Sequence, residues 1–161
     1  DDALAIATRA GRLRRNFQGY TTDPADALIG FGASAIGRLP QGFVQNAVDI
    51  AGYTRAVAQG AFATVKGIAV SADDELRGAI IERLMCDLAV DLAALPVAAA
   101  EAAPTFEYER AELDALAAAG LITIEGSRIT VTEEGRPFVR LVAAAFDAYL
   151  AQNRSRHSIA V

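Results

Sequence analysis

The sequence is poor in the residues that build metal and nucleophilic sites. Its 161 residues include one cysteine, one histidine, one methionine and no tryptophan. The single cysteine, Cys86, excludes an internal disulfide and any iron–sulfur or zinc site that needs several thiolates from this chain alone. Such sparing use of cysteine is typical of a cytoplasmic protein, and the cytoplasm is the compartment that we expect.

Positive charge and long apolar runs are scarce as well. The chain has 15 Lys and Arg against 20 Asp and Glu, a net charge of -5 that disfavours binding to nucleic-acid phosphates. Its apolar runs are interrupted by charge before the roughly 20 residues that a membrane span requires. We therefore expect neither nucleic acid nor a membrane as a partner. The 53% of hydrophobic residues indicates globular material.

The first residues are typical of a helix that is already under way. Leu4, Ala7, Ala10 and Leu13 have helical spacing, and the chain begins with Asp rather than Met. This pattern predicts a short helix within residues 2–13 that closes near Gly11. We also expect the chain to be a C-terminal piece of a longer protein.

Two neighbouring blocks stand out after this helix: RNFQGYTT at residues 15–22 and the glycine-rich run ALIGFGASAI at 27–36. The apolar run predicts a buried strand with a ligand-facing end, where Gly30 and Gly32 permit close approach to the backbone. Beside it, a polar-aromatic loop can stack on a planar ligand and offer amide hydrogen bonds. The alternative is an ordinary turn whose tyrosine packs on the core.

The rest of the chain is predicted to be mostly helical with one hairpin. The first expected elements are a helix over 46–59, a connection through Lys66-Gly67 and a helix after a capping box at 71–74. A weak segment over 96–105 and a helix over 108–120 follow. The chain then continues with a hairpin of 121–124 with 128–131 and a last helix after Pro137, which carries an apolar stripe over 138–150. From 71 to 151 this order is that of a winged-helix-like domain.

The helix before the hairpin is acidic, which bears on a DNA-binding interpretation. It contains Glu107, Glu109, Glu112 and Asp114 against Arg110 alone. Phosphate would repel such a helix, so we favour a packing or lid module over a DNA reader.

The remaining reactive residues give no catalytic constellation. Cys86 lies among apolar residues of an amphipathic pattern, which indicates a buried structural thiol. His157 belongs to a polar tail and is expected to be solvated there, unless Arg154 and Arg156 beside it meet an anionic substrate. No Ser-His-Asp grouping, phosphate loop, G-x-G-x-x-G or metal-ligand spacing is present, so no catalytic residue is expected in this chain.

Several motifs together identify a family. They are RNFQGYTT, GFGASAIG, VQN at 44–46, KG at 66–67, SADD at 71–74, LMC at 84–86 and FDAYL at 146–150. In this order and spacing the chain resembles, over essentially all of its length, the C-terminal part of the oxygen-independent coproporphyrinogen III oxidases, radical S-adenosylmethionine enzymes of haem biosynthesis. The resemblance implies that residues 1–65 are the C-terminal end of the catalytic barrel, an α/β fragment. It implies that residues 66–161 form a mostly α, winged-helix-like domain with a small β-hairpin.

The resemblance also implies a reaction. These enzymes convert two propionates of coproporphyrinogen III to vinyl groups, giving protoporphyrinogen IX. A [4Fe–4S] cluster reduces S-adenosylmethionine to a radical that abstracts hydrogen, after which carbon dioxide is lost. The family holds this cluster with a C-x3-C-x2-C motif that this sequence lacks, so the chain alone is expected to be inactive. An unidentified electron donor and a monomeric state are expected.

Only matching positions receive a role from the resemblance. It implies that Ile36, Gln18 and Phe17 line the S-adenosylmethionine region: Ile36 through a backbone or apolar contact, Gln18 through a hydrogen bond, and Phe17 as apolar wall. The chain departs from the family at His157-Ser158, where the family usually has an aromatic residue before the serine. Haem-chaperone-like relatives are the alternative, but the RNFQGYTT and FDAYL blocks favour the oxidases.

Overall fold

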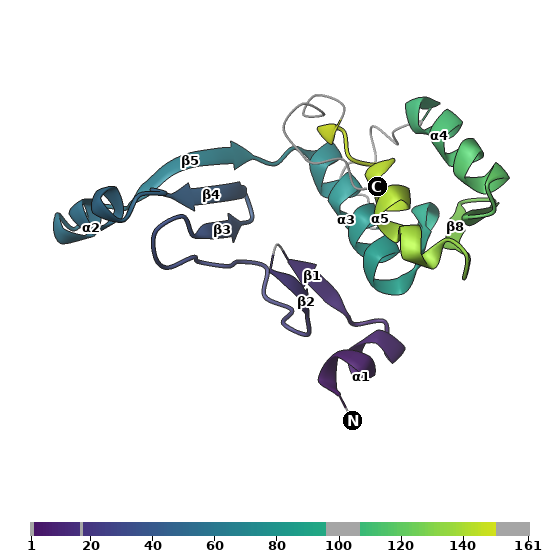
Figure 1. Ribbon diagram of the computed structural model, residues 1–161, viewed down its shortest axis with the longest axis horizontal. Helices are drawn as coiled ribbons and strands as arrows, with labels where there is room; N and C mark the ends of the chain where they lie inside the picture. Colours follow the sequence, from purple (N-terminus) through teal and green to yellow (C-terminus); the bar gives the residue numbers. More distant parts are fainter. Residues whose placement is uncertain (1, 17, 96–106, 151–161) are drawn as a thin grey trace. The chain divides into compact units, whose positions relative to one another are not determined.

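The chain divides into two compact units. A computed structural model describes residues 2–16, 18–95 and 107–150 (Figure 1). Unit 1 consists of residues 1–22 together with 72–161, and unit 2 consists of residues 23–71. Both units contain helices and strands, which confirms at this coarse level the mixed α/β fold class expected from the sequence.

Unit 1 begins with a helix and a β-hairpin. Helix α1 (Ala3–Arg9) starts at Asp2, whose carboxylate accepts the backbone N–H groups of Leu4 and Ala5, as the predicted helix requires. The RNFQGYTT block is a hairpin rather than a loop, because β1 (Arg14–Asn16) pairs antiparallel with β2 (Gly19–Thr21).

Helix α3 (Ala72–Asp87) is the centre of unit 1, and it begins directly after Ser71, as the capping-box motif predicted. One of its faces contacts β1 and places Cys86 in a small buried cluster with Ala7 and Leu13. The interpretation of Cys86 as a buried residue is therefore confirmed.

The opposite side of α3 belongs to the main hydrophobic core. It packs with α4 (Glu107–Ala118), the predicted hairpin of β7 (Ile122–Glu125) and β8 (Arg128–Val131), and α5 (Val139–Ala144). Gly120, at φ 74°, ends the α4 segment as the sequence predicted. The fully buried residues of this core are Ile80, Leu84, Ile129, Val142 and Phe146.

The sequence missed one strand of unit 1. β6 (Ala89–Asp91) pairs with β8, so the hairpin becomes a three-stranded sheet of order β6-β8-β7. The 3-10 helix η1 (Leu92–Ala94) follows β6, and the Asp91 carboxylate fixes the junction by accepting from Ala93 N–H and the Ser127 hydroxyl. These two bonds lower the pKa of Asp91, the hydroxyl being the stronger cause.

The last predicted helix is shorter than its apolar stripe suggested. A 3-10 turn, η2 (Arg136–Phe138), leads into α5, which ends at Ala144. Val142, Ala145 and Phe146 are buried, whereas Phe138 and Leu141 are about half exposed. The stripe is thus correct for its inner positions and wrong at Phe138, Leu141 and Tyr149, which are exposed.

Unit 2 is a three-stranded antiparallel sheet with one helix. The sheet has the order β3-β4-β5, from β3 (Ile36–Leu39), β4 (Gly42–Asn46) and β5 (Thr64–Ala69), and α2 (Ile50–Ala58) connects β4 to β5 (Figure 1). Two predictions were wrong here. Residues 27–36 are mostly irregular rather than one buried strand, and Lys66-Gly67 lies inside β5 rather than in a connection. The helix predicted over 46–59 begins at Ile50.

The domains predicted at 1–65 and 66–161 stay a prediction beside these two compact units. Residues 1–22 pack with α3 because backbone groups of the hairpin bond to side chains of that helix. The predicted boundary near 66 falls within β5. The assignment of these ranges to a barrel end and a winged-helix-like domain stays a prediction.

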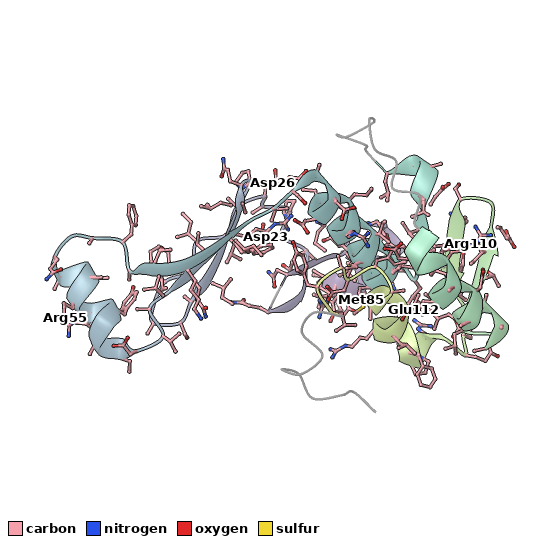
Figure 2. All side chains as sticks on the ribbon, turned by 90° about the horizontal axis from the view of Figure 1, so that it is seen from above. Asp23, Asp26, Arg55, Met85, Arg110 and Glu112 are labelled. Atoms are coloured by element: carbon pink, nitrogen blue, oxygen red, sulfur yellow. The ribbon has the colours of Figure 1, made fainter. Side chains whose placement is uncertain are left out.

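The acidic helix predicted before the hairpin is α4, on which Arg110 and Glu112 are both exposed (Figure 2). Glu109 is buried and forms an ion pair with Arg77 of α3, in which Nη1 of the arginine lies 2.6 Å from Oε1 of the glutamate. Burial by itself lowers the pKa of Arg77, but hydrogen bonds to Asp73 and Glu109 raise it above its ordinary value overall. The described helices offer no segment of the length and apolar character that a membrane crossing demands.

Candidate cofactor-binding residues and their supports

Gln18 lies in the turn of the β1–β2 hairpin. Its backbone N–H donates to Oδ1 of Asn16 at 2.8 Å, and Gly19 follows at φ 140°, a value that favours glycine. The side chain of Gln18 is exposed and makes no hydrogen bond with another described residue. A hairpin turn therefore holds the backbone while the carboxamide is available to a ligand.

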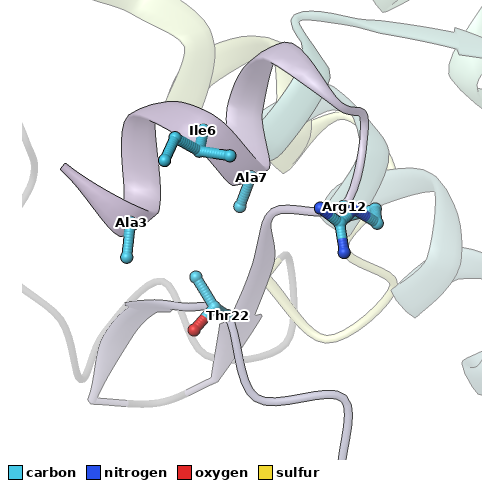
Figure 3. Close-up of a pocket in the computed structure, with 5 residues that line it drawn as sticks. All are labelled: Ala3, Ile6, Ala7, Arg12 and Thr22. Carbon is cyan, nitrogen blue, oxygen red and sulfur yellow. The ribbon is translucent and has the colours of Figure 1, made fainter. Parts of the chain in front are cut away.

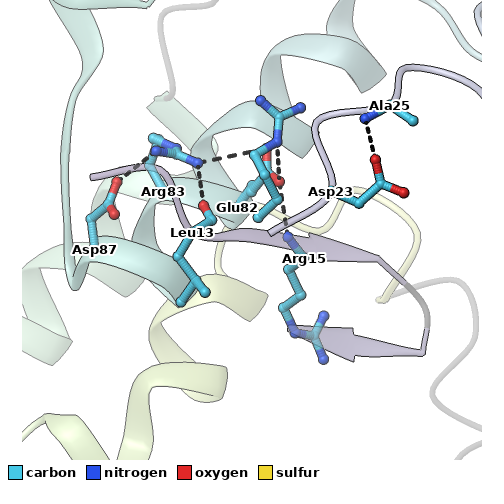
Figure 4. Close-up of polar contacts among 8 residues, drawn as sticks. Leu13, Arg15, Asp23, Ala25, Glu82, Arg83 and Asp87 are labelled. Atoms are coloured by element: carbon cyan, nitrogen blue, oxygen red, sulfur yellow. Dashed lines mark hydrogen bonds and ion pairs between the residues drawn. The ribbon is translucent and has the colours of Figure 1, made fainter. Parts of the chain in front are cut away.

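Helix α3 fixes the strands on either side of this turn. Glu82 Oε1 accepts the backbone N–H of Arg15 at 3.1 Å and lies 3.3 Å from Nε of Arg14 (Figure 4). From the other strand, the Tyr20 hydroxyl donates to the carbonyl of Met85 at 3.1 Å. Glu82 thus binds β1 by a charge-assisted bond, and Tyr20 binds β2 to the same helix.

A second arginine secures the entry to the hairpin. Arg83 donates to the carbonyl of Leu13 at 3.2 Å and to Asp87 Oδ2 at 2.7 Å (Figure 4). Across the hairpin, the Arg15 guanidinium lies 5.8 Å from the ring centroid of Tyr20, within cation–π range. Tyr20 therefore contacts the protein itself through its hydroxyl and its ring, although it is 46% exposed rather than packed on the core.

Ile36 is the first residue of β3 in unit 2 and is half-buried. The glycine-rich run ahead of it folds back on the strand: a Cβ at Gly30 would lie 2.7 Å from the Ile36 carbonyl oxygen. Gly30 is thus required by the protein's own packing. Gly32 differs, because its φ is 102° and a Cβ there would meet nothing within 4 Å.

Asn46 holds this glycine-rich run. Its Nδ2 donates to the carbonyls of both Gly30 and Gly32 at 3.1 Å each, and its backbone N–H donates to Ala35 at 3.0 Å. The Tyr53 hydroxyl from α2 accepts the N–H of Gly32 at 3.0 Å. Sequence reasoning did not assign these two residues a role, although Asn46 stands in the VQN motif.

The predicted cofactor-binding residues differ in the groups that they expose. Gly32 and Ile36 of unit 2 present open backbone and an apolar edge, and Gln18 of unit 1 separately presents an exposed carboxamide. A [4Fe–4S] cluster does not fit this chain, because Cys86 is its single cysteine. Burial raises the pKa of the Cys86 thiol to about 11, so the thiolate that a metal needs is disfavoured.

The described residues contain no cluster of side chains that could hold a metal ion. Within 2–16, 18–95 and 107–150, no three His, Cys, Asp or Glu side chains gather closely enough to hold a metal ion. A cavity of about 240 Å³ lies in unit 1 between α1 and the segment at Thr22, with Arg12 at its edge (Figure 3). Its walls are mostly the apolar residues Ala3, Ile6 and Ala7, and Gln18 is not among them.

The three residues predicted to bind the cofactor are not brought into one described site. Gln18 belongs to unit 1 and Ile36 to unit 2, so each has its own set of supporting contacts. Phe17 lies outside the described residues, as do His157, Arg154 and Arg156. Their predicted roles stay predictions.

Comparison with known proteins gives a consistent picture. Residues 70–138 match the family model of the HemN C-terminal domain. The oxygen-independent coproporphyrinogen III oxidase of Bradyrhizobium diazoefficiens is 44% identical over 161 residues, covering 100% of this chain and 36% of that protein. The enzyme of the same name from Cereibacter sphaeroides is 43% identical, covering 98% of this chain and 35% of that protein.

A solved structure of a similar enzyme agrees with these sequence matches. The coproporphyrinogen III oxidase HemN from Escherichia coli, described as a radical SAM enzyme, matches with a TM-score of 0.82 and 35% identity, over 93% of this chain and 35% of that one. The chain spans about a third of the length of these relatives. The resemblance indicated by the motifs is confirmed: this chain is similar, over nearly its whole length, to the HemN-type oxygen-independent coproporphyrinogen III oxidases, and residues 70–138 match their C-terminal domain.

Proposed function

We propose that this chain acts as the C-terminal part of an oxygen-independent coproporphyrinogen III oxidase. The full protein would convert two propionates of coproporphyrinogen III to vinyl groups, giving protoporphyrinogen IX. The observation that carries the proposal is 44% identity over all 161 residues to one such oxidase. The TM-score of 0.82 to the coproporphyrinogen III oxidase HemN of Escherichia coli supports it.

In this proposal the chain contributes part of the S-adenosylmethionine site and none of the cluster. The cofactor, reduced by the cluster, supplies the radical that removes hydrogen from the substrate. Gln18 donates or accepts a hydrogen bond through its exposed carboxamide, Ile36 offers an apolar or backbone contact, and Phe17 forms apolar wall. Because one cysteine cannot provide a three-cysteine motif, the chain alone gives no turnover.

The finer architecture belongs to the same proposal. We assign the winged-helix-like form to the C-terminal domain, supported by the chain order α3, β6, α4, β7, β8 and by the sheet order β6-β8-β7. We assign residues 1–65 to the end of the catalytic barrel. Support comes from the apolar side chains of Phe31, Ile50 and Phe62, which are all exposed in this chain.

The partners follow from the same proposal. The substrate is coproporphyrinogen III, the electron donor is a separate protein or reductant, and the enzyme works as a cytoplasmic monomer. The acidic surface of α4, where Glu112 and Asp114 are exposed, disfavours DNA as a partner.

The test is anaerobic turnover of the full-length protein that carries this chain, with reconstituted cluster, S-adenosylmethionine, coproporphyrinogen III, a low-potential reductant for the cluster and an acceptor for the electron that each substrate radical releases. We expect protoporphyrinogen IX and about two carbon dioxide molecules for each one formed, from the two propionates lost. An upstream reading frame without C-x3-C-x2-C, or stoichiometric haem binding without turnover, would contradict the proposal. The latter result would favour a haem-chaperone-like protein.

The site assignment has its own test. Gln18→Ala and Ile36→Ala in the full-length protein should each lower both protoporphyrinogen formation and S-adenosylmethionine cleavage. Exposed Gln59→Ala at the end of α2 serves as a control for side-chain loss. Unchanged rates of both reactions in the two site variants would reject the roles of Gln18 and Ile36.

A further inference from the structure

The glycine-rich run before Ile36 is held in an irregular shape by one side chain of β4. Asn46 is the last residue of β4 and lies at a register shift, where it pairs with Thr64 after Gln45 has paired with Lys66. A shift of this kind re-aims a side chain out of the regular alternation. The Asn46 carboxamide is directed at the run 30–35, where it meets two carbonyl groups.

The geometry defines which chemical group of Asn46 matters. Both partners are carbonyl oxygens, of Gly30 and Gly32, and each lies 3.1 Å from Nδ2. A carbonyl oxygen accepts but cannot donate, so the two N–H groups of the amide serve both bonds. An aspartate would have the same shape and would place a negative oxygen against two carbonyls.

The backbone between these carbonyls and Ile36 has a conformation that a chain does not adopt readily. Ser34 has φ 61°, which is unusual for a residue other than glycine, and its N–H donates to the Ala47 carbonyl at 2.8 Å. Gly32 has φ 102° and its N–H is bonded to the Tyr53 hydroxyl. Several hydrogen bonds are therefore needed to keep one conformation.

We propose that Asn46 is a positioning residue for S-adenosylmethionine binding: it holds the backbone of residues 30–35 so that Gly32 and Ile36 present one preformed surface to the cofactor. Tyr53 is the second support, acting on Gly32 from α2. The inference rests on the proposed function, because it assumes that Ile36 contacts the cofactor. It goes beyond that function by naming residues that touch the protein's own loop rather than the ligand.

The test compares variants of the full-length protein by equilibrium binding of S-adenosylmethionine and by KM and kcat. Asn46→Asp should raise the dissociation constant and KM for S-adenosylmethionine about tenfold or more, because two bonds to a partly buried loop are lost. Its kcat at saturating cofactor should change by a smaller factor than KM does. Tyr53→Phe should act in the same direction by a smaller factor. Gln41→Glu, the same amide-to-acid change in the exposed β3–β4 turn, should alter neither constant.

The outcomes separate this inference from the proposed function. A fall in kcat or in folded protein at unchanged KM and unchanged dissociation constant would make Asn46 merely structural and overturn the inference. If the unsubstituted protein binds S-adenosylmethionine but forms no protoporphyrinogen, the proposed function fails, whereas the binding constants still decide the role of Asn46. If the unsubstituted protein does not bind S-adenosylmethionine, both fail.

Discussion

Unit 1 and unit 2 differ in how they bury apolar surface. In unit 1 the side chains of Ile80, Leu84 and Phe146 are wholly inaccessible, enclosed by helices and a three-stranded sheet. In unit 2 the buried apolar side chains are the small ones of Ala47 and Ala63, while Phe31 and Phe62 are 88% and 96% exposed. Unit 1 has a core of its own, whereas hydrogen bonds to backbone groups give unit 2 much of its shape.

The largest effect should come from emptying the unit 1 core. Phe146→Ala leaves a cavity where no solvent reaches, and a loss of about 3–5 kcal/mol of unfolding free energy is expected. Ile68→Ala on β5, 52% exposed, is the control in unit 2 and should change stability by about 0.5 kcal/mol or less in the isolated chain. Urea unfolding followed by helix content measures both. Equal losses would contradict the contrast between the units.

In unit 2 the backbone should be the sensitive element. Gly42 has φ 147°, and a Cβ there would strike the carbonyl of Ile68 on β5. Gly42→Ala should therefore destabilise the β3-β4-β5 sheet by at least about 2 kcal/mol. Gly78→Ala on α3, where a Cβ meets nothing within 4 Å, should instead stabilise unit 1 by roughly 0.5–1 kcal/mol. Amide exchange of each unit reports these changes, and a tolerated Gly42→Ala would refute the packing described for β4 and β5.

A buried ion pair should matter more than an exposed one within unit 1. Arg77 and Glu109 lie 2.6 Å apart with side chains 16% and 10% exposed, whereas Arg110 and Asp114 lie 3.5 Å apart at 75% and 62%. Glu109→Gln should cost about 2–3 kcal/mol because the guanidinium loses its buried partner. Asp114→Asn should cost about 0.5 kcal/mol or less. Thermal unfolding compares the two variants, and similar losses would count against the burial of Glu109.

High pH should weaken unit 1 through Cys86. Its pKa is raised from 9.0 to about 11 in the fold, chiefly because burial disfavours the thiolate. The stabilisation from the neutral thiol is complete below pH 9, declines as the unfolded thiol ionises, and is lost as pH passes about 11. Cys86→Ala should flatten this part of the stability profile. An unchanged slope in Cys86→Ala would show that another group causes the loss.

Local signals explain which elements could be predicted from the sequence. The helix after Ser71, the helix before Gly120 and the hairpin around Gly126 have strong periodicity and end at residues that favour turns, and all three are present. The prediction of a strand over 27–36 was wrong because it rested on apolar composition alone. The shape of this run depends on the Asn46 side chain, 14 and 16 residues away from the glycines that it binds. A tertiary bond of this kind leaves no periodic signal.

The site was predicted from resemblance more than from physics. The RNFQGYTT block was interpreted as a loop, and sequence alone could not show that it is a hairpin bound to Glu82, because that contact spans 67 residues. Likewise, β6 is only three residues long and is a strand because β8 pairs with it. Long-range pairing decided both features, and local propensity is weak for such short segments.

Hydrogen exchange on two samples, the chain alone and the full-length protein that carries it, tests the contrast between the units most directly. We predict that amides of β3, β4 and β5 exchange much faster in the chain alone, while those of α3 and β8 are equally protected in both. This result would mean that other parts of the full-length protein cover the exposed apolar side chains of unit 2. Protection of unit 2 in the chain alone as strong as that of α3 would contradict the account.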